Sequence, residues 1–314
     1  MAFSPARCRI EASPKTKSRY EILVKLVKNE IHINDESQAL QKRIRDPDQL
    51  GKIACELRKT VLKMVHHAGS GHIGGSLSCL DILTCLYFGE MRHYPFRADW
   101  PARDRFVLSK GHAAPALYAI LARSGYIASH DLLQLRRLES ILQGHPDSRR
   151  CPGIEASTGS LGQGLSVAHG MALATQDQPT LPRVYVLLGD GELQEGQTWE
   201  AAMSAGHYRT HNLCALIDAN GLQLDGTVRH IKNVEPISDK FIAFGWNAID
   251  IDGHDIQGIL QALDQARSCQ DRSTVIIART VKGKGVSLFE NKSEWHGKVP
   301  NEKQLQIALE ELSS

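Results

Sequence analysis

The sequence predicts an α/β fold in which a mainly parallel sheet carries helices on both faces. Four strand candidates lie at residues 184–188, 213–217, 247–251 and 275–278, and they read as continuous apolar runs. Strands of this kind are typical of a sheet that is covered on both sides. Stretches of helical length separate the four runs, and such connections join parallel strands.

The earlier elements follow from periodicity and from end signals. Residues 53–68 predict an amphipathic helix, because Ile53, Leu57, Val61 and Val65 recur at four-residue steps and Gly69 then stands where a left-handed residue is favoured. Residues 77–88 are apolar nearly all round and predict a buried helix. The other predictions are a strand at 106–108 and helices at 114–122, 132–142, 192–208, 236–244 and 255–268.

The composition is that of an ordinary globular protein. The chain has 314 residues, of which 42% are hydrophobic and 23% charged, and its net charge is +2. These values exclude a disordered chain and give no general attraction to nucleic acid. No apolar run approaches the roughly 20 residues of a membrane helix, so no membrane association is expected. The seven cysteines are scattered and form no Cys-x-x-Cys pair, which predicts a reducing, cytoplasmic setting.

Residues 1–48 predict a basic N-terminal extension, and residues 49–314 a single domain. Ten Lys and Arg stand against seven Asp and Glu in residues 1–50. Asp46-Pro47-Asp48 marks a plausible boundary. A basic, serine-containing segment is also typical of an organelle transit peptide, but we interpret this one as a solvated extension or a short surface helix.

Polar residues at two strand ends give the sharpest functional signal. Gly189-Asp190-Gly191 follows the strand at 184–188, and Asn220 follows the strand at 213–217, with 28 residues between Gly191 and Asn220. Ligands of such folds bind beyond the carboxyl ends of the strands, so Asp190 and Asn220 should be neighbours there. Oxygen ligands of this type suit Mg²⁺, which usually combines one or two carboxylates with substrate phosphates. The alternative is a Gly-Asp-Gly turn beside a second turn with a structural Asn.

Gly-Asp-Gly with Asn about 28 residues later is the thiamine diphosphate-binding motif, and the longer string Gly189-Asp-Gly-Glu-Leu-Gln-Glu-Gly-Gln-Thr-Trp-Glu200 resembles transketolase. Five further blocks agree in order over roughly residues 50–300. They are Ser70-Gly71-His72, Ser109-Lys110-Gly111-His112-Ala113-Ala114, Gly144-His145-Pro146, Thr158-Gly159-Ser160-Leu161-Gly162-Gln163-Gly164, and Lys282-Gly283-Lys284-Gly285 with Trp295-His296-Gly297-Lys298. The resemblance implies a transferase that moves a two-carbon ketol unit from a ketose phosphate to an aldose phosphate.

The resemblance also implies roles for residues of the matched blocks. Thiamine diphosphate and Mg²⁺ (or Ca²⁺ or Mn²⁺) would be the cofactors, with Asp190, the Asn220 side chain and the Leu222 carbonyl on the metal. The implied cofactor contacts are Lys110, His112, Gly191, Lys282 and His296 around the diphosphate, and Gly159, Ser160 and Leu161 beside the rings. The implied catalytic residues are His72 and His145 at the sugar hydroxyls, His296 at the substrate entrance, and Glu195 in a chain of carboxylates that links two active sites.

Simple chemistry agrees with this division. A diphosphate needs cationic donors besides the metal, and Lys110 and Lys282 are suitable point charges. Proton transfer to and from sugar hydroxyls near neutral pH suits histidine. Any single histidine is more often structural, and we keep that interpretation for those outside the matched blocks. Glu195 has the alternative of a solvated helix residue.

The resemblance also has departures. Residues 159–161 read Gly-Ser-Leu where many transketolases have Gly-Pro-Leu, and His296 with Lys298 replaces a pair of histidines. Complete transketolases continue into a pyrimidine-binding domain, whose glutamate contacts the cofactor, and no glutamate here matches it. We therefore hypothesise the N-terminal subunit of a split transketolase, which pairs with a separate C-terminal subunit and self-associates into a heterotetramer. The alternatives are a 1-deoxyxylulose-phosphate synthase, a 2-oxoacid dehydrogenase component, and a non-catalytic regulatory subunit.

Overall fold

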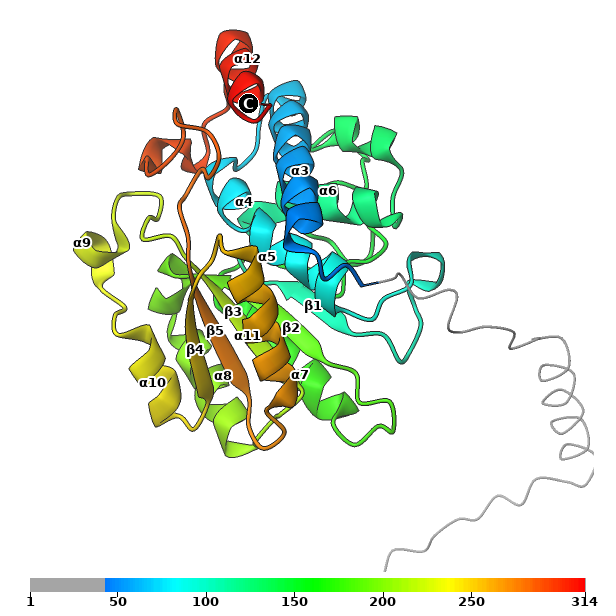
Figure 1. Cartoon of the computed structure of the whole chain (residues 1–314), viewed down its shortest axis with the longest axis vertical. Helices are drawn as coiled ribbons and strands as arrows, with labels where there is room; N and C mark the ends of the chain where they lie inside the picture. The colour runs from blue at the N-terminus through cyan, green and yellow to red at the C-terminus, as the bar shows by residue number, and fades with distance from the viewer. Residues whose placement is uncertain (1–42, 314) are drawn as a thin grey trace, which may run out of the picture. The chain divides into compact units, whose positions relative to one another are not determined.

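The computed structural model describes residues 43–313 and has the predicted fold class, a five-stranded parallel sheet with helices on both faces (Figure 1). Most of the predicted extension at residues 1–48 lies outside the described residues. The first described helix, α3 (Pro47–Ala68), begins within the predicted boundary, where the Asp46 side chain accepts a hydrogen bond from the Asp48 N–H at 3.1 Å. Gly69 ends it in the left-handed conformation (φ 64°), as the sequence predicts.

All strand pairs are parallel, and their order across the sheet is β1-β2-β3-β5-β4. Alternate residues of the central strands point into two separate apolar cores: Tyr185 and Leu187 into one, Val184 and Val186 into the other. The strand bounds are β1 (Arg105–Leu108), β2 (Val184–Gly189), β3 (Leu213–Ala219), β4 (Asn247–Asp252) and β5 (Thr274–Arg279). The continuous apolar runs of β2, β3 and β5 are therefore explained by burial on both faces.

Helices α3, α5, α6 and α11 contribute buried side chains to one core, and α7, α8 and α10 to the other. The bounds of the α-helices after α3 are α4 (Gly74–Ser78), α5 (Leu80–Thr84), α6 (Ala114–Ser124), α7 (Gln163–Thr175), α8 (Gly196–His207), α9 (Val228–Lys232), α10 (Ile237–Ala243), α11 (Ile256–Ser268) and α12 (Glu302–Glu311). The π-helix is η1 (Cys85–Glu90), and the 3₁₀ turns are η2 (Pro95–Arg97), η3 (Gly111–Ala113), η4 (Ser129–Gln134), η5 (Gly191–Gln194) and η6 (Ser293–His296).

Three predictions about these elements are wrong in part. The continuous helix at 77–88 is broken into the end of α4, α5 and η1, and the Ser78 hydroxyl at the break bonds the Gly75 carbonyl and Asp218. The helix at 132–142 is absent beyond η4, because Arg136 (φ 58°) and Glu139 (φ 64°) have left-handed backbones. Strand β4 lies at the sheet edge and is half-exposed instead of buried.

Three helices, α7, α9 and α12, are absent from the sequence-based prediction. Helix α7 contains two glycines, and Val167 and Leu173 lie on its exposed face, so its sequence shows no clear amphipathic pattern. Helix α12 is mostly polar, but Asn301 and Gln304 form a reciprocal capping box at its start, with bonds of 2.9 and 3.0 Å. That box is the signal that could have located it.

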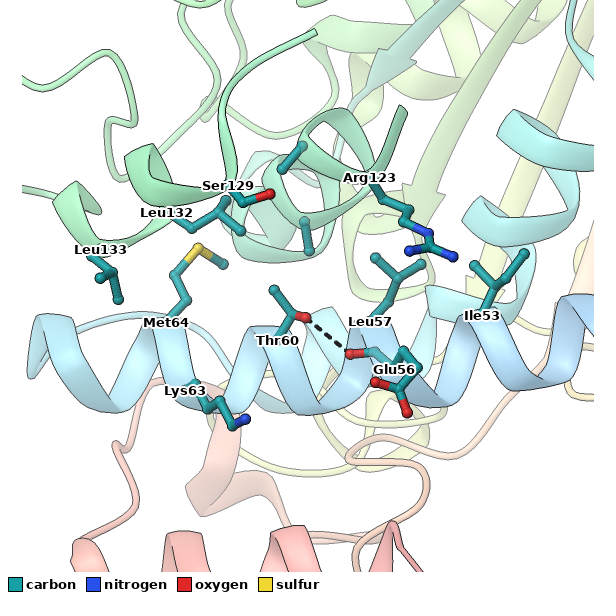
Figure 2. Close-up of a pocket in the computed structure, with 12 residues that line it drawn as sticks. Ile53, Glu56, Leu57, Thr60, Lys63, Met64, Arg123, Ser129, Leu132 and Leu133 are labelled. Carbon is teal, nitrogen blue, oxygen red and sulfur yellow. Dashed lines mark hydrogen bonds between the residues drawn. The ribbon is translucent and has the colours of Figure 1, made fainter. Parts of the chain in front are cut away.

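A cavity of about 410 Å³ lies between α3, α6 and η4, away from the sheet (Figure 2). Leu57, Met64 and Leu132 line its apolar side, and Lys63 and Arg123 lie at its rim. None of the residues predicted from the sequence to belong to the functional site lines this cavity. No helix within residues 43–313 is long and apolar enough to cross a membrane. The six cysteines in this part of the chain are free thiols.

Candidate active site

A cavity of about 290 Å³ opens at the carboxyl ends of the strands and gathers most of the predicted site residues. Ten of them line it: Lys110, His112, Leu161, Asp190, Gly191, Glu195, Asn220, Leu222, Lys282 and His296. The topology explains this gathering, because β1, β2, β3 and β5 are parallel and the loops after them therefore leave the sheet at one edge. The remaining four predicted residues, His72, His145, Gly159 and Ser160, are not in its lining.

Asp190 directly follows β2 and is buried. Its two carboxylate oxygens accept backbone hydrogen bonds, one from Gly191 at 2.8 Å and one from Gly221 at 2.5 Å. Gly221 follows Asn220, so the predicted neighbourhood of Asp190 and Asn220 is confirmed. Burial, with the nearby Asp218 charge, raises the pKa of Asp190 to about 6. Among residues 43–313 no Lys, Arg or His side chain forms an ion pair with it.

Asn220 and Leu222 occupy the turn after β3. The Asn220 side-chain amide donates to Asp218 at 3.1 Å, and its oxygen accepts the Leu222 N–H at 3.1 Å. The Leu222 carbonyl accepts a hydrogen bond from the Lys282 ammonium at 3.1 Å. The described residues contain no group of three His, Cys, Asp or Glu side chains that could hold a metal alone. A metal here would therefore need an amide or carbonyl oxygen beside Asp190.

Lys110 and Asp218 form a buried ion pair beneath the cavity, with both side chains at most 1% exposed. Asp218 also accepts bonds from Ser78, at 2.6 Å, and from Thr280 and Asn220. Burial alone would raise the pKa of Asp218, but Lys110 overcomes this and holds the pKa below its usual value. Burial alone would likewise lower the pKa of Lys110, but the Asp218 charge outweighs burial and raises the pKa above its usual value. Sequence reasoning missed Asp218, although it lies two residues before Asn220 at the end of a predicted strand.

Lys282 follows β5 and is also buried, but no carboxylate among residues 43–313 pairs with it. Its ammonium donates to the Leu222 carbonyl and to Nδ1 of His296, at 2.9 Å. Burial is the larger cause and the nearby Lys110 charge the smaller one, and together they lower the pKa of Lys282 to about 8. In Asp190 and Lys282 the cavity thus holds a buried carboxylate and a buried ammonium that form no ion pair within residues 43–313.

Four histidines from distant parts of the chain cluster at the cavity. The ring of His72 lies with its centroid 5.4 Å from His296, 5.5 Å from His112 and 6.2 Å from His145, and His112 and His296 are 5.0 Å apart. Burial and then neighbouring cations lower the pKa of each ring, that of His72 to about 4 and that of His296 to about 3. All four rings are therefore neutral near pH 7.

This cluster predicts a pH dependence of stability. A histidine with a lowered folded pKa is neutral in the folded state, whereas the unfolded chain binds a proton below pH 6.5, so stability falls as pH drops from 6.5 toward 4. For His72 we expect a loss of about 1 kcal/mol by pH 5, after allowance for partial exposure. Urea unfolding at pH 7 and pH 5 measures it, and the His72→Gln variant should lose less stability than wild type over that interval. An equal loss in both proteins would contradict the assignment.

The loop that carries the Gly-Ser-Leu sequence lies against β1 and β2. A Cβ on Gly111 would stand 2.8 Å from the Gly159 nitrogen, so these two backbones are in close contact. Gly159 has φ 145° and abuts His145: a Cβ on it would lie 3.0 Å from the His145 ring. Ser160 is exposed. The loop thus places Leu161 in the cavity lining and packs Gly159 against His145 next to the cavity.

Glu192 is a second buried carboxylate that sequence reasoning missed. One of its oxygens accepts bonds from Ser109 at 2.5 Å and Gly162 N–H at 2.9 Å, and the other accepts the Gly189 N–H at 3.1 Å. It therefore ties together the three loops that carry Lys110, Leu161 and Asp190. Its place two residues after Asp190 in the matched string was the available signal.

Glu195 precedes α8 at the cavity rim and is exposed. Its Cβ approaches the backbone closely at Gly162, where an added Cβ would lie 2.8 Å away. No hydrogen bond or ion pair of its side chain is present within residues 43–313. Its predicted role in linking two active sites remains a prediction.

Comparisons with known proteins agree with this geometry. A family described as "Transketolase, thiamine diphosphate binding domain" matches residues 51–312. A 6-deoxy-6-sulfo-D-fructose transketolase subunit from Clostridium sp. is 46% identical over 82% of this chain and 93% of its own length. One of the subunits of an apulose-4-phosphate transketolase, from Phocaeicola vulgatus, is 42% identical over 82% of this chain and 91% of its own.

Among solved structures, a transketolase from Campylobacter jejuni aligns with a TM-score of 0.81 and 36% identity, covering 85% of this chain. The match covers 43% of that transketolase, so this chain corresponds to less than half of it. The matched family and the relatives of similar length agree with the fold and with the motifs. The chain belongs to the family of transketolase domains that bind thiamine diphosphate.

Proposed function

We propose that this chain is the N-terminal subunit of a thiamine diphosphate-dependent transketolase, which transfers a two-carbon ketol unit together with a separate C-terminal subunit. One observation carries the proposal: a single cavity contains Asp190, a buried carboxylate without a cation, and Lys282, a buried ammonium without an anion. A divalent cation that carries a diphosphate supplies both missing charges at once.

The donor set fits such a group. Asp190 and the Asn220 and Leu222 oxygens lie around one turn, and the Leu222 carbonyl already accepts a cationic donor. We assign these three residues to the metal, Mg²⁺ in the first place and Ca²⁺ or Mn²⁺ as substitutes. Lys110, His112, Gly191, Lys282 and His296 are then assigned to the diphosphate, and Gly159, Ser160 and Leu161 to the rings. When bound, thiamine diphosphate supplies the electron sink for the two-carbon unit.

The residues of this chain would bind, orient and move protons. The neutral ring of His145 can accept a proton from a sugar hydroxyl and return it, and the neutral rings of His72 and His296 can form hydrogen bonds with the sugar oxygens that take part in this transfer. His72, His112 and His296 are partly buried and His145 is exposed, so the cluster limits the access of water on one side and leaves the other open to a substrate. Glu192 would hold the three loops in place before the cofactor arrives.

The names and lengths of two relatives support a partner subunit. The two relatives of similar length are named as subunits, and the matched region covers 93% and 91% of their own lengths. We propose a C-terminal subunit with the pyrimidine-binding domain, a heterotetramer of two chains of each kind, a cytoplasmic location, and Glu195 at the contact between active sites. The substrates would be ketoses with a terminal anionic group, such as the phosphate and sulfonate in the names of those relatives.

The test is to co-express the full chain with a candidate C-terminal subunit, add thiamine diphosphate and Mg²⁺, and follow ketose phosphate, sulfonated ketose and pyruvate by NMR. We expect consumption of a ketose only when an aldose phosphate acceptor is present. Consumption of pyruvate would favour the synthase or dehydrogenase alternative. Failure of the chain to bind thiamine diphosphate by calorimetry would favour a non-catalytic subunit.

A further inference from the structure

Arg136 lies in a strained turn beside the histidine cluster, and no matched motif includes it. Its backbone is left-handed (φ 58°), a conformation that arginine rarely adopts, and its N–H donates to the Leu142 carbonyl at 2.8 Å to close the turn. Residues in such conformations concentrate at functional sites, where the surrounding structure holds them in place. The turn therefore places the Arg136 side chain in a defined position.

The guanidinium group reaches back toward the start of the domain. One terminal nitrogen donates to the Ser70 hydroxyl at 2.7 Å, and the other donates to Nδ1 of His72 at 3.2 Å. The group packs directly on Gly144, where an added Cβ would stand 3.2 Å from Nε. Within residues 43–313 no carboxylate pairs with Arg136, and its Nε is buried without a hydrogen-bond partner. Its position is thus explained by Ser70 and His72 and by no ion pair.

Arginine has five N–H donors and no acceptor, and it stays charged at all accessible pH values. Nδ1 of His72 must therefore accept, which leaves the ring proton on Nε2. We propose that Arg136 is a positioning residue that fixes His72 as the Nε2–H tautomer, so that the ring presents a hydrogen-bond donor on the side away from Arg136. This donor suits a carbonyl or hydroxyl oxygen of a sugar.

The same arrangement occurs once more in the cluster. The Lys282 ammonium donates to Nδ1 of His296 at 2.9 Å, so this ring also has its proton on Nε2. The two rings lie at 5.4 Å and nearly perpendicular. Each therefore has a cation behind it and an N–H on its far side. Two such donors can hold two oxygens of one substrate. This use rests on the proposed function, whereas the assignment of the two tautomers does not depend on it.

The charged and titratable groups that face His72 act in one direction. Arg136 from the turn after η4, His145 from the following loop and Lys282 from the loop after β5 all oppose a second proton on the ring, in addition to burial. His112 and His296 also lie against it and are themselves neutral. No carboxylate is bonded to the ring among the described residues. The neutral donor form is therefore maintained near pH 7.

The tautomer is measured directly by ¹⁵N NMR of the full chain with labelled histidine, using His72→Gln to assign the signals. We expect wild-type His72 to be Nε2–H, with a protonation midpoint near 4. In Arg136→Met, both neutral tautomers should be populated and the midpoint should move toward 6.5. The control is Arg137→Met, which removes the adjacent exposed arginine and should change neither quantity.

Two results would overturn the proposal: an Nδ1–H tautomer at wild-type His72, or an unchanged tautomer and midpoint in a folded Arg136→Met protein. If that variant does not fold, the wild-type tautomer alone decides, and Arg136→Lys, which retains a donor, should preserve it. The measurement needs neither partner nor substrate. A protein with the expected tautomer but no ketol transfer would therefore refute the proposed function and leave this inference intact.

Discussion

Asp190→Ala is expected to weaken Mg²⁺-dependent binding of thiamine diphosphate by more than about 100-fold, because loss of residues that merely orient metal ligands already costs about 10- to 100-fold. Asp190 is the single carboxylate among the three proposed metal ligands, and the other two are neutral oxygens. Isothermal calorimetry with the cofactor, with and without Mg²⁺, measures the loss. Transfer activity with a partner subunit should fall in parallel.

The stability of this variant separates binding from folding. Burial raises the pKa of Asp190, so its charge is a cost to the cofactor-free fold at pH 7; this cost offsets the two backbone hydrogen bonds that its removal deletes, and the free energy of unfolding should change little. Asp177→Ala is the matched control, since that aspartate is exposed and does not line the cavity. Unchanged cofactor affinity in Asp190→Ala would contradict the assignment of the metal site.

Lys110→Met is expected to destabilise the chain by about 3–5 kcal/mol, because it leaves the Asp218 carboxylate buried without its counter-charge. Asp218→Asn should be costly for the converse reason. In the double variant neither charge remains, so the loss should be smaller than the sum of the two single losses. Urea unfolding of the four proteins measures this coupling.

The exposed pair of Lys59 and Glu56, with its nitrogen and oxygen 3.3 Å apart, provides the control. Lys59→Met should cost less than about 1 kcal/mol, as is usual for solvent-exposed pairs. A loss of similar size at Lys110 would mean that the buried pair contributes no more than a surface pair. It would also mean that the folded structure beneath the cavity does not depend on the pair of Lys110 and Asp218.

The parallel sheet and its ligand edge could be predicted from the sequence because buried strands leave continuous apolar runs. Residues 184–188 and 213–217 were identified in this way, and the residues that follow them lie in the cavity. The helix predicted at 132–142 was wrong because no periodicity reveals a left-handed backbone at Arg136. Helix α7 was missed because two glycines interrupt its apolar pattern.

The groups that hold the site in place were harder to predict than the groups that line it. Lys110, Asp190 and Lys282 belong to recognisable motifs. Glu192 also lies in a matched string, but like Asp218 and Arg136 it acts through hydrogen bonds across 30 to 140 residues of chain. Their partners depend on packing in three dimensions, which spacing along the chain does not encode. The sequence likewise does not reveal that Asp190 lacks a cationic partner and Lys282 an anionic one, because this depends on burial and ion pairing in the folded chain.

The most direct test of a split transketolase is to titrate the purified C-terminal subunit into a fixed amount of this chain, with cofactor and Mg²⁺, and to measure ketol transfer. We predict no transfer by either subunit alone and a rise that saturates at an equimolar ratio. Size-exclusion chromatography of the saturated mixture should give a single heteromeric species. Robust transfer by this chain without a partner would contradict the account.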